Sequence, residues 1–92
     1  MDIVTIRLAT PLRKFVGGRQ EVQVAGRSVA EALAQLDAQY PDLRGRVIGA
    51  DGGLRDFIQL HVGRTPLRQL GGIAAALQNG NVISLSSPFS GG

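Results

Sequence analysis

Two short runs of alternating hydrophobic and polar residues constrain the fold more than any other feature of this sequence. Residues 3–8 and residues 20–24 both alternate, and the pair Gly17-Gly18 lies in the loop between them. The apolar face of the first run consists of Val4, Ile6 and Leu8. A period of two is typical of a strand with one buried face. The sequence therefore predicts an antiparallel hairpin at the start of the chain.

A single amphipathic helix is predicted directly after this hairpin. Ser28 and Glu31 have the spacing of a capping box. In that motif the serine side chain accepts from the amide of Glu31, and the Glu31 carboxylate accepts from the amide of Ser28. Helical spacing then relates Val29, Leu33 and Leu36. Because a helix seldom continues into a proline, Pro41 predicts its end near residues 39–40.

The second half of the chain predicts a strand, a turn and a short edge strand. Residues 57–62 alternate, and the residues expected to face inward are Ile58, Leu60 and Val62. Gly63-Arg64 predicts a tight turn into a short strand over residues 66–68. A proline at position 66 suits an edge strand, because the missing amide donor costs little there.

Three further segments complete the order of elements. Residues 42–53 are polar and contain glycine, with one short helical turn predicted around Leu43, Val47 and Ile48. A second short helical turn is predicted over residues 73–77, and Asn79-Gly80 signals a turn after it. Residues 82–85 form the last predicted strand.

This order of elements predicts an α+β domain, in which one main helix packs on one face of a mixed sheet of four to five strands. The first and last strands are expected to lie side by side and parallel in the centre, because the helix between them allows a crossover. That arrangement is the β-grasp, or ubiquitin-like, fold. Residues 1–86 are expected to form this domain, and residues 87–92 a flexible C-terminal tail.

Composition excludes several kinds of site. The chain has no cysteine, which excludes disulfides, thiolate metal sites and cysteine nucleophiles. His61 is the only histidine, which argues against a metal cluster or a Ser-His-Asp triad. No apolar run approaches the roughly 18 residues needed to cross a bilayer, and the first residues lack the pattern of a signal peptide. We therefore expect a cytoplasmic protein without a bound metal and without a membrane partner.

The net charge of +3 comes from arginine, because the chain has nine arginines and only one lysine, Lys14. Basic surfaces bind phosphates or acidic partners. The arginines are scattered, however, and the chain offers only four aromatic residues for stacking on bases. Nucleic-acid binding is therefore disfavoured. Arg64 and Arg68 are candidates for pairing with an acidic partner protein, although a solvated surface explains them better.

The chain ends with residues 87–92, Ser-Pro-Phe-Ser-Gly-Gly. Two terminal glycines carry no side chains, so they can enter a narrow channel and present the Gly92 carboxylate inside another protein's active site. A frayed terminus would explain the same dipeptide. Its position one short segment after the last predicted strand favours a reactive end.

The last third of the chain carries a series of features typical of one family. The series consists of an Arg- and Phe-bearing strand over residues 55–62, Gly71-Gly72, Gly80-Asn81, a final strand and Gly91-Gly92. In this series, and over its whole length, the chain resembles the ubiquitin-like sulfur carriers (MoaD-, ThiS- and CysO-like proteins), above all the CysO-like and long MoaD-like members. It departs from them at Asn81, where aspartate is common, and at Ser86-Ser87, where an apolar residue and a proline are usual.

The resemblance implies a carrier protein and not an enzyme. Family members are adenylated at the terminal glycine by an ATP-dependent activating enzyme, and a sulfur donor then displaces AMP to leave a thiocarboxylate. Gly92 is accordingly the expected site of AMP or thiocarboxylate attachment, with no other cofactor bound. A second partner would accept the sulfur: a cysteine-synthase-like enzyme, slightly favoured, a large molybdopterin synthase subunit, a thiazole synthase or an enzyme of secondary metabolism. The free protein is expected to be a monomer.

The chemistry of the tail and the outward face of the predicted sheet indicate candidate partner-binding residues. Gly91 is expected to keep bulk away from the reacting carbonyl, and Pro88 and Phe89 to anchor the tail in a partner. Covering the edge of the core is the alternative role for Phe89. A candidate partner surface on the outward face of the sheet consists of Phe57, Gln59, His61 and Val82, although an ordinary sheet surface explains them equally well.

Two other functions are compatible with these residues. A ubiquitin-like modifier would use the same adenylate to join Gly92 to lysines of other proteins, and the single Lys14 argues mildly against chains built from this protein alone. A non-catalytic basic binding module is the other alternative. It predicts that removal of Gly91-Gly92 leaves function intact.

Overall fold

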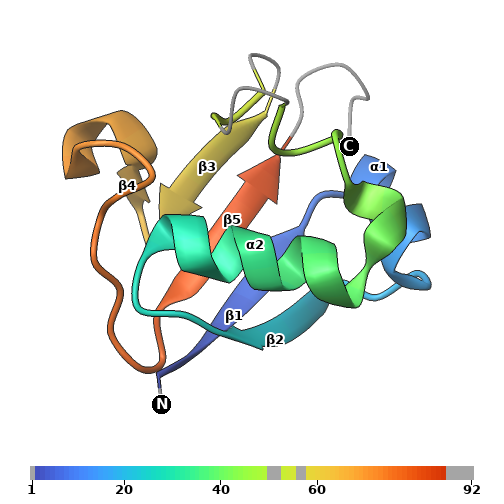
Figure 1. Ribbon diagram of the computed structural model, residues 1–92, viewed down its shortest axis with the longest axis horizontal. Helices are drawn as coiled ribbons and strands as arrows, with labels where there is room; N and C mark the ends of the chain where they lie inside the picture. The colour runs from blue at the N-terminus through green and yellow to red at the C-terminus, as the bar shows by residue number, and fades with distance from the viewer. Residues whose placement is uncertain (1, 50–52, 56–57, 87–92) are drawn as a thin grey trace.

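The computed structural model describes residues 2–49, 53–55 and 58–86, which form a five-stranded sheet with a helix across one face (Figure 1). The strands are β1 (Ile3–Leu8), β2 (Glu21–Ala25), β3 (Gln59–Val62), β4 (Thr65–Pro66) and β5 (Val82–Ser86). The α-helices are α1 (Thr10–Arg13) and α2 (Val29–Gln39). Short 3-10 helices are present at Lys14–Val16, Pro41–Leu43 and Leu67–Leu70.

The first and last strands lie side by side at the centre of the sheet, whose order is β2-β1-β5-β3-β4. β1 is antiparallel to β2, with Ile6 opposite Val22, and parallel to β5, with Ile6 opposite Ile83. β3 pairs antiparallel with both β5 and β4. A parallel central pair requires a crossover, which α2 provides. The predicted β-grasp topology is confirmed.

The sheet face beneath α2 is apolar. Alternate residues of β1 and β5 point to this face, and Val4, Ile6 and Ile83 are fully buried there. From α2 the residues at helical spacing, Val29, Leu33 and Leu36, are also buried. Burial stabilises each such side chain by about 1.5–3 kcal/mol relative to exposure. The apolar faces predicted for the hairpin and the helix are therefore correct.

The capping box at the start of α2 forms with one change of partner. Ser28 Oγ accepts a hydrogen bond from the backbone amide of Glu31 at 3.2 Å, as predicted. The Glu31 carboxylate accepts from the amide of Arg27 at 3.0 Å and not from that of Ser28. Ser28 is extended and bridged to Ala76. With Ser28 in that conformation, the Glu31 carboxylate reaches the amide of Arg27, the residue before Ser28.

The segment over residues 73–77 is not a helical turn, so this prediction was wrong. The carbonyl of Ile73 accepts from the amide of Ala30 at 2.8 Å, and that of Ala75 accepts from the amide of Val29 at 3.0 Å. The first amides of a helix have no partner within the helix. This segment supplies their acceptors: a turn, in which the amide of Ala75 donates to the carbonyl of Gly72 at 3.0 Å, is followed by the bridge between Ala76 and Ser28.

Two short helical turns in the structure were not predicted from the sequence. The loop between β1 and β2 contains α1, which has Pro11 in its first turn, where a missing amide costs nothing. The strand predicted over residues 66–68 ends at Pro66, because Leu67 turns into a 3-10 helix and packs against the core.

The chain after α2 also differs from the prediction. The helix ends at Gln39, close to the predicted boundary, and Pro41 begins a 3-10 helix. That turn, Pro41–Leu43, lies earlier than the one predicted around Leu43, Val47 and Ile48. Val47 is buried in the core, and Ile48 forms a β-bridge with Leu54.

Candidate functional site

The candidate reactive end follows β5, a central strand of the sheet. Within β5, the carbonyl of Leu85 accepts a hydrogen bond from the backbone amide of Ala9 at 3.0 Å, and the strand ends at Ser86. Because β1 and β5 are parallel, their carboxyl ends lie together near α1 (Figure 1). The chain therefore leaves the sheet at its centre, beside the start of α1.

Five of the predicted site residues, four in the tail and one predicted on the sheet face, are not among those that the structure describes. Pro88, Phe89, Gly91 and Gly92 follow Ser86, and Phe57 precedes β3. Their roles stay predictions, as does the division of the chain after residue 86. Gly92 is six residues beyond the end of β5.

A network of asparagine side chains holds the turn before β5. Asn79 Oδ1 accepts from the backbone amide of Ile3 at 2.8 Å, and Asn81 Oδ1 accepts from the amide of Gln78 at 2.8 Å. Gly80 has a φ of 88°, and its amide donates to the carbonyl of Ile3 at 2.8 Å. Aspartate and asparagine both supply a side-chain oxygen for such turns. Asn81 therefore keeps the acceptor that the more common aspartate would provide.

The sheet face opposite α2 carries the other candidate partner residues. Gln59 and His61 flank buried Leu60, and Val82 precedes buried Ile83, so all three point away from the core as predicted. His61 lies opposite Ser84 of β5 and Pro66 of β4, as the strand register shows. Neither of these cross-strand neighbours is acidic. His61 therefore lacks, on the adjoining strands, the carboxylate of a Ser-His-Asp triad.

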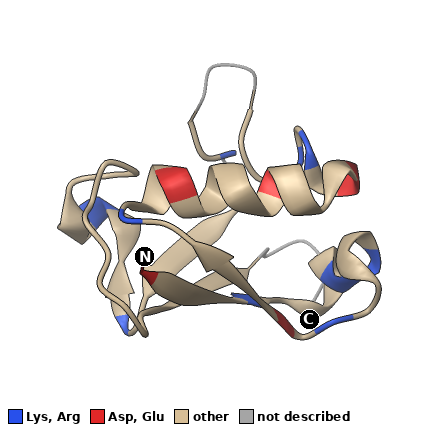
Figure 2. Cartoon of the chain, turned by 60° about the horizontal axis from the view of Figure 1, so that its bottom comes forward, with Lys and Arg blue, Asp and Glu red and all other residues tan. Residues whose placement is uncertain are grey.

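Arg64 and Arg68 lie at the β4 edge of the sheet. Arg64 is in the turn between β3 and β4, and Arg68 is in the 3-10 helix after β4. Arg68 also lines a hollow of about 440 Å³ together with His61 and Leu67. Figure 2 shows basic segments (blue) on the short helical turns at either end of the molecule and acidic segments (red) along α2.

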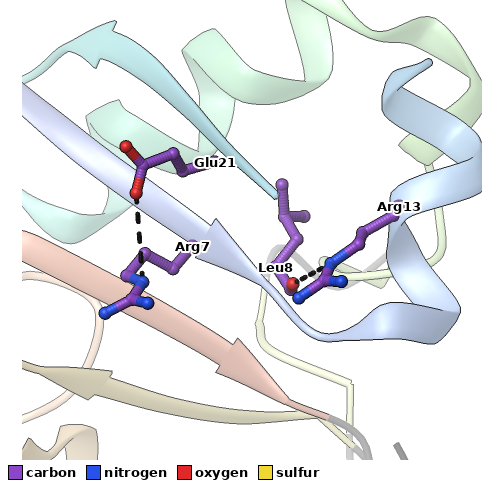
Figure 3. A network of polar contacts seen from close by, with 4 residues as sticks. All are labelled: Arg7, Leu8, Arg13 and Glu21. Atoms are coloured by element: carbon purple, nitrogen blue, oxygen red, sulfur yellow. Dashed lines mark hydrogen bonds and ion pairs between the residues drawn. The ribbon is translucent and has the colours of Figure 1, made fainter. Parts of the chain in front are cut away.

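Polar contacts hold the carboxyl end of β1 (Figure 3). Arg13 Nε donates to the carbonyl of Leu8 at 2.9 Å, which ties α1 to the end of the strand. Arg7 Nε lies 3.9 Å from Glu21 Oε2, and both side chains are exposed. An exposed ion pair of this kind contributes little to stability, because water screens it.

One carboxyl group on α2 titrates unusually. Burial raises the pKa of the Asp37 carboxyl, and the nearby Arg44 guanidinium partly offsets that rise. Among the residues that the structure describes, no group of three His, Cys, Asp or Glu side chains is placed to hold a metal ion. The described helices include none that is long and apolar enough to cross a membrane.

Sequence reasoning missed a basic hollow beside α1, which we call the α1 hollow. It has a volume of about 270 Å³. Residues that line it include Pro11, Leu12, Lys14, Phe15, Arg46 and Ile58. Its basic residues come from separate parts of the sequence, so no linear run of charge could reveal it. Pro11 and Gly17 were the signals for the helical turns that form one wall, because proline favours the first turn of a helix and glycine its end.

Comparison with known proteins places the chain in a family. The ThiS family profile matches residues 6–92. The chain belongs to the ThiS family. It is therefore a ubiquitin-like protein of a family of small sulfur carriers, which are not enzymes themselves.

Individual relatives share both sequence and fold with this chain. Sulfur carrier protein CysO of Mycobacterium tuberculosis is 28% identical over 91 residues, which cover 97% of this chain and 98% of CysO. A chain of the Amycolatopsis orientalis BexX/CysO complex is 26% identical, with a TM-score of 0.87 over 97% of this chain and 99% of that one. Small archaeal modifier protein 3 of Haloferax volcanii is 32% identical over 65 residues, covering 71% of this chain and 70% of that protein.

Proposed function

We propose that this protein is a sulfur carrier that is adenylated at Gly92 and then holds sulfur as a C-terminal thiocarboxylate. The observation that carries the proposal is the family match, which extends to Gly92 itself on a domain whose central strand ends six residues earlier. The likeness to the sulfur carrier CysO over nearly the whole chain supports the same function.

The chemistry requires activation, because a carboxylate is a poor electrophile. A Gly92 carboxylate oxygen attacks the α-phosphorus of ATP in an activating enzyme, and pyrophosphate leaves. Sulfur from a donor then attacks the Gly92 carbonyl carbon, and AMP leaves as the C–S bond forms. The groups that catalyse both steps belong to the partner enzymes. The carrier supplies the reacting terminus.

The architecture suits delivery of that terminus into a channel. Six residues span at most about 20 Å when extended, so Gly92 can enter a deep site while the domain stays outside. In this proposal Gly91 leaves the channel unobstructed, and Pro88 and Phe89 contact its wall. His61 on the open sheet face and Phe57, which precedes β3 in the sequence, are the candidate residues for the surrounding contacts.

We propose a cysteine-synthase-like enzyme as the sulfur acceptor, because CysO is among the relatives that match the chain over most of its length. A large molybdopterin synthase subunit, a thiazole synthase or an enzyme of secondary metabolism is the alternative. The BexX/CysO complex supports a protein partner for a chain of this fold.

Intact-mass measurement tests the proposal. The purified chain is incubated with the activating enzyme of the same organism, ATP and sulfide. Its mass is expected to rise by the difference between sulfur and oxygen. A variant lacking Gly91-Gly92 should stay unmodified, whereas the control Ser90→Ala, which keeps the length and the terminus, should react as the native chain does. An unchanged native mass with an enzyme that adenylates another carrier would refute the proposal.

A second candidate function is protein modification through Gly92, which the likeness to small archaeal modifier protein 3 favours. Both functions need the same acyl-adenylate, but the modifier ends in an amide bond to a lysine. Expression of a tagged chain in its native cell separates them. Covalent adducts with Gly92 joined to lysines would favour the modifier. A function that survives loss of Gly91-Gly92 would favour a basic binding module.

A further inference from the structure

The α1 hollow has an apolar floor that is part of the core. Leu12 and Ile58 line it and also belong to the buried core. Pro11 and Phe15 add further apolar surface, and Phe15 packs against the core. A side chain that enters the hollow therefore meets a preformed surface and does not have to order it first.

Two cations contact the same aromatic ring beside this floor. Lys14 Nζ lies 5.2 Å from the centroid of the Phe15 ring, and the Arg46 guanidinium carbon lies 4.1 Å from it. Arg46 Nε also donates to the carbonyl of Asp42 at 2.9 Å. The ring and the carbonyl hold the guanidinium in place. Its terminal nitrogens make no hydrogen bond to the part of the chain that the structure describes.

The two cations on the Phe15 ring have no acidic partner in the described part of the chain. Lys14 and Arg46 form no ion pair with any described acidic residue. Arg55 also lines the hollow, where its Nε donates to the carbonyl of Gly45 at 2.7 Å. Two like charges on one ring repel each other, and an anionic ligand would relieve that repulsion.

The hollow also adjoins the point at which the chain leaves the sheet. Ala9 is hydrogen-bonded to Leu85, and Pro11 of the hollow is two residues further along the chain. An enzyme that takes the C-terminal tail into its active site must come close to the residues around this exit. The hollow would then face the mouth of that active site.

We propose that the α1 hollow is a docking site for an acidic segment of the enzyme that activates Gly92. This inference rests on the proposed function. The fixed guanidinium of Arg46 matches a carboxylate in a two-pronged contact, and Lys14 adds a second charge beside it. The apolar floor accepts the methylene groups of an aspartate or glutamate side chain or an apolar neighbour.

A nucleic acid fits the hollow less well than an acidic protein segment. Single-stranded nucleic acids bind where bases stack on available aromatic faces along a basic groove. Lys14 and Arg46 both contact the Phe15 ring, so the hollow presents N–H donors more than an aromatic face. The measurement below separates the two ligands.

Matched charge reversals test the site. The hollow variant is Arg46→Glu, and the comparison is Arg27→Glu, which changes the net charge equally at an exposed residue before α2. ATP–pyrophosphate exchange with the activating enzyme of the same organism gives the KM for the carrier. We expect the hollow variant to raise this KM about tenfold or more, with kcat almost unchanged. The comparison variant should raise this KM less than about twofold. Added salt should reduce the difference in KM between the two variants.

A milder variant tests the same site with less risk of unfolding the protein. Arg46→Lys keeps the charge but loses the planar guanidinium, so an intermediate rise in KM, about threefold, is expected. Circular dichroism of each variant should match that of the native chain. Equal KM values for the two charge reversals would overturn the inference. So would tight binding of a fluorescent single-stranded RNA that is lost only in the hollow variant while KM is unchanged. A native chain that the enzyme does not adenylate overturns the proposed function as well.

Discussion

The two ends of the central strand pair, β1 and β5, are built differently. At the amino end, hydrogen bonds close the connections: Asn79 to Ile3, Gly26 to Asp2, and residues 73–77 to the start of α2. At the carboxyl end, hydrogen bonds from Arg13 to Leu8 and from Ala9 to Leu85 also hold the chain, but the side chains of Lys14 and Arg46 have no acidic partner among the described residues. Both ends of the two strands thus secure the fold, and the carboxyl end also carries charges that are available to a partner.

The largest loss of stability is expected from Gly26→Ala, at the amino end of the strand pair. A Cβ at position 26 would lie 2.8 Å from the backbone nitrogen of Ala32, so α2 or the chain before it must shift. We expect a loss of about 1–3 kcal/mol in the free energy of unfolding, measured by chemical denaturation. At the other end, Lys14→Gln should change it by less than about 0.5 kcal/mol, because Lys14 is exposed and forms no ion pair with the described residues. Similar losses of stability at both ends would show that the two ends do not differ in this way.

A smaller effect is expected from Asn79→Ala. The variant removes the acceptor for the backbone amide of Ile3, and the expected loss in the free energy of unfolding is about 1 kcal/mol. Asn79→Asp retains a side-chain oxygen and should stay closer to the native stability. The KM for activation should be native in both variants, because the change lies away from the exit of the chain. A raised KM in a folded Asn79→Ala protein would show that the amino end also contributes to partner binding.

The smallest effect is expected from Asp37→Asn, and it depends on pH. Burial raises the pKa of Asp37 in the folded protein, with a partial offset from Arg44. The folded state therefore binds the proton more tightly, so this contribution to stability is present below the unfolded pKa and lost as pH rises through the folded pKa. Asp37→Asn should be more stable than the native chain at pH 7, by less than about 1 kcal/mol because the side chain is partly exposed. Thermal unfolding should show no difference near pH 3. A difference that persists there would have a cause other than ionisation.

Local patterns predicted the elements whose form depends on their own residues. Alternation in residues 3–8 and 82–85 identified the central strands, because one face of each is buried. Ser28 identified the start of α2, since its side chain accepts from the amide of Glu31. The prediction over residues 73–77 failed because the carbonyls there accept from amides of α2, which are more than forty residues away in the sequence.

The sequence by itself determined the glycine-rich terminus, the absence of cysteine and the order of strands and helix, because each depends on residue type or local periodicity. Only the tertiary structure decided which basic residues act together. It brings Lys14 and Arg46, from opposite sides of β2 and α2 in the sequence, onto the ring of Phe15. Arg64 and Arg68, which the sequence singled out, lie at the β4 edge. Contacts between distant segments follow from how the helix and sheet pack, and no periodicity along the chain encodes them.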